Sequence, residues 1–107
     1  MIPSATTQEL STPQLRVLTT ALRARRPRQA AEHDIEIRSV PVRTCYETMM
    51  RLTGPREAVL DYAAFLYAEE GHGSPIPAPP LAVEEAHVDD ETDSMSIVLS
   101  RGAYSPR

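Results

Sequence analysis

The sequence contains no lysine, no asparagine and no tryptophan, and it has a single cysteine, Cys45. One cysteine cannot form a disulfide within the chain, which argues against a secreted domain held together by disulfides. Aromatic residues make up only 5% of the chain, so a deep cofactor pocket walled by aromatic rings is not expected. Because every basic residue is arginine, the composition is typical of a GC-rich coding sequence and indicates a bacterial or phage source.

Long apolar runs are missing as well. No stretch approaches the roughly 18 consecutive apolar residues of a membrane-spanning helix. The opening residues, Met1 to Ser4, lack the basic and apolar regions of a signal peptide. We therefore expect a cytoplasmic protein without membrane attachment.

The domain organisation follows from length and composition. A chain of 107 residues with 41% hydrophobic and 24% charged residues fits one small globular domain. Residues 1–11 are mostly polar and are predicted to form a mobile tail. Prolines and glycines crowd residues 71–80, which we interpret as a stiff connector. The prediction is therefore a domain at 12–100 that includes this connector, with a C-terminal tail at 101–107.

Two segments have the features of helices. Thr12 followed by Pro13 is typical of an N-cap and first helical position, and leucines follow at helical spacing until Pro27 ends the helix. A short strand over 15–20 is the alternative for this segment. A second helix is predicted over 55–70, with an apolar stripe broadened by neighbours on either side: Val59, Tyr62, Ala63 and Leu66, with Ala58 and Phe65.

The remaining segments read as strands. Residues 35–53 alternate apolar and polar side chains, but the phase of the alternation changes at Pro41. This pattern predicts either one bent strand or two strands that meet near residues 39–41. Two further strands, at 81–88 and 95–99, are joined by polar residues and form a predicted hairpin.

Together these elements predict an α+β fold. We expect a small, mainly antiparallel sheet with the 55–70 helix packed on one face, in a β(β)αββ order that is partly ferredoxin-like, plus an N-terminal helix. This likeness concerns architecture alone and implies no function.

Charge is divided unevenly along the chain. Residues 1–56 hold nine arginines and five acids, a net charge of +4, whereas residues 57–107 hold ten acids and two arginines, a net charge of −8. No arginine or lysine occurs between Glu57 and Ser100. Such asymmetry bears on binding partners and association rates rather than on the fold.

The densest acidic segment coincides with the predicted hairpin. Six carboxylates occur within ten residues: Glu84, Glu85, Asp89, Asp90, Glu91 and Asp93. One interpretation is a solvated tip that keeps the strand from pairing with another chain. The other is a surface that binds a basic partner, because carboxylates can replace phosphates as bidentate acceptors for arginine. The segment lacks the glycine and final glutamate of a calcium loop, so no metal site is predicted.

Arginines form a second cluster at the end of the first predicted helix: Arg23, Arg25, Arg26 and Arg28. Cations at a helix C-terminus are favourable without any partner, and this is the preferred interpretation. Nucleic-acid contact through the segment Arg16 to Arg28 is the alternative, although no stacking aromatics accompany it. Arg43 and Arg51, on the strand that carries Cys45, would extend the cluster as a secondary surface.

No catalytic or cofactor-binding pattern is evident. Arg43 could lower the pKa of Cys45, but no histidine neighbours this thiol in the sequence. The three histidines, His33, His72 and His87, are too scattered for a zinc site. We therefore expect no catalytic residues, no metal and no cofactor.

The favoured hypothesis is a small non-enzymatic protein that engages a basic surface of a larger macromolecular complex through its acidic hairpin. A phage- or plasmid-type inhibitor of a nucleic-acid-binding machine would fit, with nucleic acid itself not expected as the direct ligand. The alternatives are a nucleic-acid-binding accessory protein that uses Arg16 to Arg28, and a small enzyme or ligand-binding domain that uses Cys45.

Overall fold

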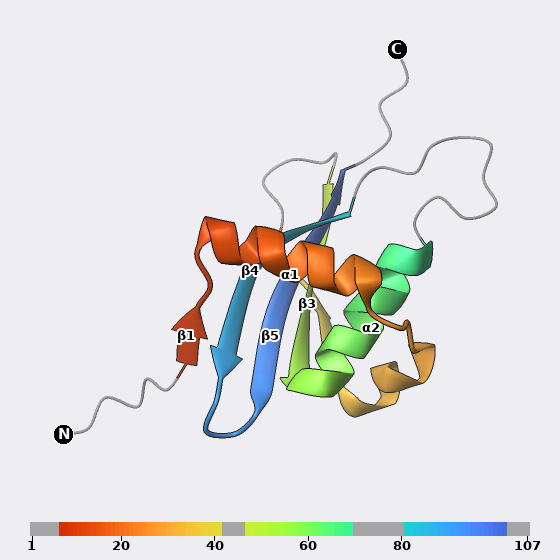
Figure 1. The fold of residues 1–107 in the computed structure, drawn as a ribbon. Coiled ribbons are helices and arrows are strands. Elements are labelled where there is room, and N and C mark those ends of the chain that lie inside the picture. Colours follow the sequence, from red (N-terminus) through yellow and green to blue (C-terminus); the bar gives the residue numbers. More distant parts are fainter. Residues whose placement is uncertain (1–6, 42–46, 70–80, 103–107) are drawn as a thin grey trace, which may run out of the picture.

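The computed structural model describes residues 7–41, 47–69 and 81–102 (Figure 1). These residues form, in chain order, β1 (Thr7–Glu9), α1 (Thr12–Ala24), a 3-10 helix (Gln29–Asp34), β2 (Glu36–Ser39), β3 (Glu47–Pro55), α2 (Arg56–Glu69), β4 (Leu81–Asp89) and β5 (Ser94–Gly102). The predicted α+β class is confirmed. None of the helices in these residues is long and apolar enough to cross a membrane.

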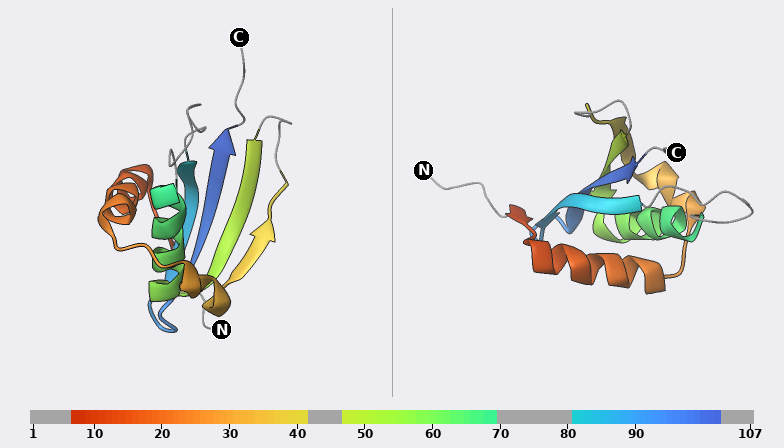
Figure 2. Two further views of the ribbon diagram at one scale, coloured as in Figure 1. Left: turned by 90° about the vertical axis from the view of Figure 1, so that its right-hand side faces the viewer. Right: turned by 90° about the horizontal axis from the view of Figure 1, so that it is seen from above.

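The strands form a single sheet in the order β1-β4-β5-β3-β2, and each neighbouring pair is antiparallel. Both α-helices lie on the same face of this sheet (Figure 2). We call the opposite side the open face, because no helix of the described residues covers it. The predicted connector at 71–80 lies outside the described residues.

Residues 35–53 form two strands rather than one bent strand. β2 and β3 pair antiparallel with Glu36 opposite Thr53 and Ile37 opposite Leu52. In this register, odd-numbered residues of β2 face the same side as even-numbered residues of β3. The change of apolar phase in the sequence therefore reflects the reversal of chain direction between two strands.

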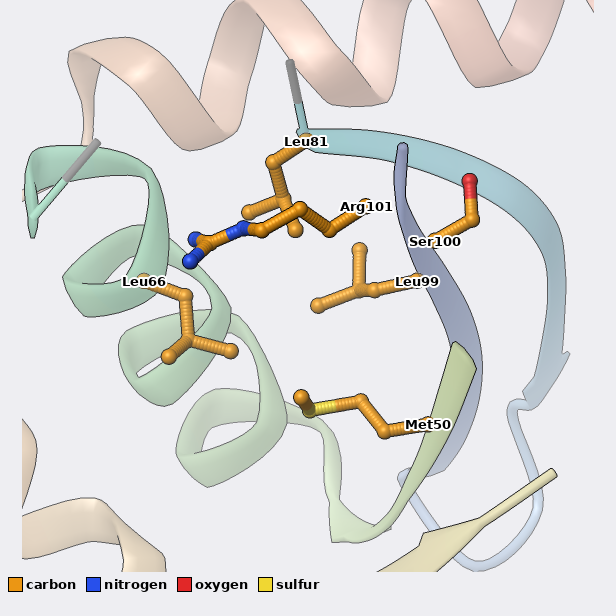
Figure 3. A pocket seen from close by; sticks show the side chains of 6 residues that line it. All are labelled: Met50, Leu66, Leu81, Leu99, Ser100 and Arg101. Atoms are coloured by element: carbon orange, nitrogen blue, oxygen red, sulfur yellow. The ribbon is translucent and has the colours of Figure 1, made fainter. Parts of the chain in front are cut away.

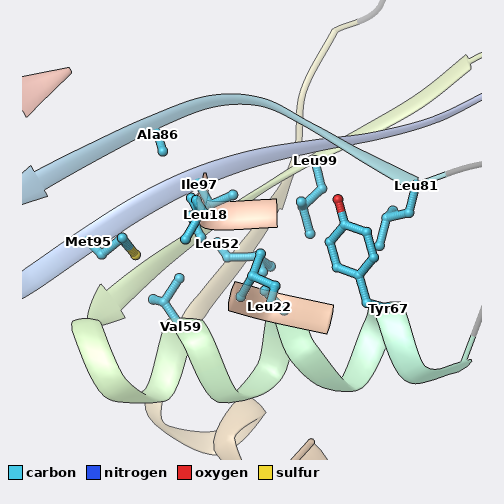
Figure 4. Close-up of a cluster of buried hydrophobic side chains, with 11 residues drawn as sticks. Leu18, Leu22, Leu52, Val59, Tyr67, Leu81, Ala86, Met95, Ile97 and Leu99 are labelled. Carbon is cyan, nitrogen blue, oxygen red and sulfur yellow. The ribbon is translucent and has the colours of Figure 1, made fainter. Parts of the chain in front are cut away.

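The core lies between the two helices and the covered face of the sheet (Figure 4). Leu22 from α1, Val59 from α2, and Leu52, Ile97 and Leu99 from the central strands are its largest fully buried side chains. Segments far apart in the sequence, from a helical layer and a sheet layer, thus share one apolar cluster, as expected for a domain of this size.

The buried face of α2 differs from the predicted stripe. Val59 and Ala63 are fully buried as predicted, but Tyr67 takes the next position, whereas Tyr62 and Leu66 only flank the cluster. α1 packs beside α2, and the ring of Tyr67 lies under Arg23 of α1. The contact with α1 therefore turns the buried face of α2 toward α1. The periodicity of the α2 sequence alone does not predict this shift.

The predicted N-terminal tail is wrong over residues 7–11. β1 pairs with β4, and the N–H of Leu10 donates to the carbonyl of Ala86 (2.9 Å). Ser11, not Thr12, is the N-cap of α1, and it forms a capping box in which its N–H donates to Oε1 of Gln14 (2.7 Å). This reciprocal pair satisfies N–H groups that a helix start otherwise leaves without partners.

The other boundaries need smaller corrections. α1 ends at Ala24, before Pro27, so the predicted helix replaces the alternative strand at 15–20. The 3-10 helix at Gln29–Asp34 was not predicted. β5 continues to Gly102, so the predicted C-terminal tail loses its first two residues to the sheet, and 103–107 lie outside the described residues.

Gly54 makes the close approach between β3 and the 3-10 helix possible. Its φ is +157°, and a Cβ placed there would lie 3.0 Å from Cγ2 of Ile35 and 3.1 Å from the carbonyl oxygen of Asp34. Glycine is therefore required where the chain passes from β3 into α2.

Candidate functional site: an acidic surface on the open face

A β-bulge brings two consecutive carboxylates to the open face. The register between β4 and β5 shifts between Val83 and Glu85, so that Glu84 has no partner of its own on β5. Side chains normally alternate between faces, but a bulge interrupts the alternation. Ser100, which faces the open side, donates its hydroxyl to Oε2 of Glu84 (2.6 Å). Glu84 and Glu85 therefore both lie on the open face.

Glu85 and His87 form a contact cluster with a third residue from the opposite end of the chain. His87 lies directly opposite Glu9 of β1, and Glu85 is two residues away on the same face. Nε2 of His87 lies 3.0 Å from Oε2 of Glu85. One ligand atom from each of Glu9, Glu85 and His87 lies within 4.8 Å of the others. Carboxylate and imidazole groups are metal ligands, so these are the residues that could hold a divalent cation.

This cluster already has a cation beside it. Nη2 of Arg51 lies 3.9 Å from Oε2 of Glu85, and Nη1 of Arg51 donates to the hydroxyl of Ser96 (3.4 Å). The hydrogen bond of the His87 ring goes to Glu85 rather than to a serine or threonine of the described residues. The arrangement therefore lacks the hydroxyl–imidazole pair of a nucleophilic enzyme.

The hairpin at the end of β4 is held in a defined conformation. Oδ1 of Asp89 accepts hydrogen bonds from the N–H groups of Glu91 (3.0 Å) and Thr92 (3.4 Å). Asp93 adopts a left-handed backbone conformation, with φ of 53°. Aspartate tolerates this conformation better than most residues, and its acceptor side chain stabilises turns. Part of the acidic run therefore builds the turn itself.

Arg56, at the start of α2, contacts the hairpin. Its Nε donates to Oδ1 of Asp93 (2.9 Å), its Nη2 donates to Oδ1 of Asp90 (3.4 Å), and its N–H donates to the carbonyl of Asp93 (2.9 Å). The hydrogen bond to Asp93 is the main reason that the pKa of Arg56 is raised. Two acids of the tip thus share one intramolecular cation.

The six predicted carboxylates consequently do not form a uniform projecting tip. Glu84, Glu85 and Asp89 lie along β4 on the open face, whereas Asp90, Glu91 and Asp93 lie in the turn. Glu9 and His87 join the first group, although neither was predicted as a site residue from the sequence. Their only signal would have been the pairing of β1 with β4, which no local pattern reveals. We call the six carboxylates of residues 84–93, together with Glu9, the acidic surface.

The arginine cluster is largely engaged within the molecule. Nε of Arg25 donates to Oδ1 of Asp61 (2.8 Å), and its Nη2 contacts Glu57. Nη1 of Arg28 lies 3.2 Å from Oδ2 of Asp61. The hydrogen bond to Asp61 is the largest cause of the raised pKa of Arg25. Arg26 is exposed, and the guanidinium of Arg23 lies 5.4 Å from the centre of the Tyr67 ring.

Arg43 and Cys45 lie outside the described residues, so the structure does not place them relative to Arg51 or to the other arginines.

The described residues form several hollows, which range from about 100 to 320 Å³. One of about 100 Å³ lies between α2 and the sheet, lined by Met50, Leu66, Leu81, Leu99, Ser100 and Arg101 (Figure 3). A wider groove of about 320 Å³ lies between α1 and β4, beneath Arg16 and Arg23. A hollow of about 130 Å³ on the open face is lined in part by Thr53, His87 and Asp89. The first and last of these volumes are well below the roughly 300–1,000 Å³ of a pocket for a drug-sized ligand, and the groove is at the lower limit of that range.

Comparisons of the chain with protein-family models, with curated proteins and with solved structures give no match.

Proposed function

We propose that this chain is a non-enzymatic binding protein whose acidic surface engages an arginine- or lysine-rich surface of a larger macromolecular complex. The observation that supports the proposal is that carboxylate side chains lie in a row along the open face of β4. The bulge at Glu84 and Glu85, the cross-strand neighbour Glu9 and the turn at 90–93 extend this row from the sheet into the hairpin. A surface that is mainly acidic, as this one is despite Arg51 and Arg56 beside it, attracts a basic partner and accelerates association.

The class of partner follows from the chemistry of carboxylates. A pair of carboxylate oxygens accepts the two parallel N–H groups of arginine, as phosphate oxygens do. A protein surface that normally binds a nucleic-acid backbone therefore matches the acidic surface, and its inhibition or regulation would be the outcome of binding. The hydrogen-bonded turn at Asp89 favours this role, because a preformed surface loses little entropy on binding.

The alternative of nucleic-acid binding through Arg16 to Arg28 gains less support. Arg25 and Arg28 contact Asp61, so part of their charge is neutralised within the molecule. Affinity for a nucleic-acid backbone rises with the number of phosphates that free cations neutralise. A nucleic-acid role would therefore rest on Arg16, Arg23 and Arg26.

The test measures association of the chain with an immobilised oligo-arginine peptide at two salt concentrations. One variant combines Glu9→Gln, Glu85→Gln and Glu91→Gln, which removes three charges without touching the hydrogen bonds of Asp89, Asp90 and Asp93 that hold the turn. The matched control combines Glu32→Gln, Asp34→Asn and Glu69→Gln, which removes the same charge elsewhere. We expect the association rate to fall about tenfold in the first variant and clearly less in the control, because nearby charges dominate steering.

Equal losses in the two triple variants would overturn the proposal, since net charge alone would then explain attraction. Unchanged association in the first variant would do the same. Circular dichroism and thermal melting of each variant show whether the fold is retained, and a single-stranded DNA probe in parallel tests the alternative.

A further inference from the structure

β2 is an edge strand with an exposed outer side. It lies at the end of the sheet, next to β3, and all four of its residues are exposed. Ile37, in its middle, is a large apolar residue with high exposure, at 42%. An edge strand presents unpaired N–H and C=O groups, which form a template for another strand. The edge of β2 is therefore a surface on which a further strand fits.

The hydrogen bonding of β2 to β3 shows which main-chain groups are available. The N–H of Val40 donates to the carbonyl of Met49 (3.0 Å), so this pair belongs to the bonded pairs of the ladder. Bonded and non-bonded pairs alternate along an antiparallel ladder. Arg38 and Glu36 thus direct their main-chain groups toward β3, whereas Ser39 and Ile37 direct theirs away from the sheet.

The side chains of β2 are self-complementary in charge. Glu36 and Arg38 face the open side, whereas Ile37 between them faces the covered side, opposite Leu52. Nη2 of Arg38 lies 2.8 Å from Oε2 of Glu36 in the same strand. If a second β2 runs antiparallel with Ile37 opposite Ile37, each Glu36 faces an Arg38 of the other copy. The same register places the two isoleucine side chains next to each other. Their outward N–H and C=O groups then form a bonded pair across the symmetry axis.

We propose that β2 pairs with β2 of a second copy of this chain, antiparallel and centred on Ile37, so that the two sheets become continuous. A two-fold axis through Ile37 makes the contact isologous, the commonest arrangement of homodimers. Other registers are disfavoured, because shifting one strand by two residues removes a glutamate–arginine pair at each end. Four residues on each side bury little surface compared with stable interfaces, so the dimer is weak and forms at high concentration.

Reversing one charge at a time tests the pairing directly. In Glu36→Arg, two arginines of one strand face two arginines of the other, and in Arg38→Glu the glutamates face each other. Like charges directly opposite are destabilising in antiparallel pairs, whereas opposite charges stabilise them. Sedimentation velocity over a concentration series should show a wild-type dimer and about tenfold weaker dimerisation of either variant.

A mixture of the two variants separates this proposal from any other contact. Glu36→Arg and Arg38→Glu chains are complementary to each other in the proposed register, so their equimolar mixture should dimerise about as well as the wild type. The double variant, Glu36→Arg with Arg38→Glu, restores both pairs and should also dimerise. A mixture that remains as monomeric as its separate components would overturn the antiparallel register centred on Ile37.

A proline variant tests the main-chain contribution. Ile37→Pro removes an N–H that points away from β3, so the ladder between β2 and β3 keeps its hydrogen bonds while the outer edge loses a donor. Thr7→Pro is the matched control at the other edge of the sheet. We expect Ile37→Pro to abolish dimerisation and Thr7→Pro to leave it unchanged, with circular dichroism of both variants as the check of folding. A wild type that stays monomeric throughout the concentration series, or dimers that persist in Ile37→Pro, would overturn the proposal.

Discussion

The two faces of β5 show how one strand serves two purposes. Met95, Ile97 and Leu99 point toward the helices and are buried in the core, whereas Ser94, Ser96 and Ser100 point to the open face. Both sets belong to the nine residues of β5, in which odd-numbered residues face the helices and even-numbered residues face the open side. The covered face supplies the apolar burial that stabilises the domain, and the open face is left for polar side chains that can contact a partner.

Among the described residues, each side of the sheet also has an exception to this division. On the covered side, Asp61 of α2 is only 9% exposed and is held by Arg25 and Arg28. On the open face, Val98 of β5 is only 4% exposed, although its cross-strand neighbours are Arg51 and Glu85. Substitutions at residues that follow the division, and at Asp61 and Val98, which do not, therefore measure how much each side of the sheet contributes to the free energy of unfolding.

The largest effect is expected for Ile97→Ala on the covered face. Ile97 is fully buried in the cluster that contains residues of both helices, so its truncation loses transfer free energy and leaves a cavity. We expect the free energy of unfolding to fall by about 2–5 kcal/mol. Urea denaturation followed by circular dichroism measures this change.

Ser96→Ala, one residue away on the open face, is the matched control for Ile97→Ala. It removes a hydroxyl that contacts Arg51 and Thr53 near the surface. Its expected effect is within about 0.5 kcal/mol, as for most surface substitutions. Similar losses in the two variants would show that the faces do not differ in their contribution to stability.

An intermediate effect is expected for Asp61→Asn. The substitution keeps the size of the side chain but removes the charge that Arg25 and Arg28 share. Because Asp61 is buried and Arg25 is mostly covered, we expect a loss of about 1–3 kcal/mol, chiefly from the contact with Arg25. The side chain of Arg28 is 60% exposed, so solvent screens its contribution.

Glu57→Gln provides the control for Asp61→Asn, since Glu57 contacts the same Arg25 but its side chain is 71% exposed. Its effect should remain below about 1 kcal/mol. Thermal melting of both variants at low and at high salt measures the difference. If Glu57→Gln were as destabilising as Asp61→Asn, burial would not determine the strength of these ion pairs.

The same contrast explains what the sequence could predict. α2 and the β4–β5 hairpin follow from nearby residues: proline at Pro55, alternation along 81–88 and a polar turn. The start of α1 was predicted one residue late, because Thr12 precedes Pro13, whereas the structure has Ser11 as the N-cap in a capping box with Gln14. β1 could not be predicted, because three residues become a strand only when β4 is beside them.

The candidate site was predictable only in part for the same reason. The carboxylates of 84–93 stand out in the sequence, but their separation into a sheet group and a turn group depends on the bulge at Glu84 and on Arg56. The addition of Glu9 and His87 depends on the register between β1 and β4. Contacts between residues far apart in the chain carry this information, and a single sequence read by local patterns does not.

The smallest of the main effects is expected for Val98→Ala, which tests whether the open face contributes to stability at all. Val98 is nearly as buried as Ile97, its neighbour in sequence, but lies on the other side of the sheet. Removing its two methyl groups should lower the free energy of unfolding by about 1.5 kcal/mol, at roughly 0.8 kcal/mol for each buried group. Urea denaturation under the conditions used for Ile97→Ala measures the loss.

The loss in Val98→Ala should stay below that in Ile97→Ala, because polar side chains beside Val98 can close over the vacated space more easily than the packed core. A loss as large as that of Ile97→Ala would mean that the open face holds a second core. In that case Arg51 and Glu85 would act mainly as a cover for Val98, and the acidic surface would begin at Asp89 rather than at Glu84.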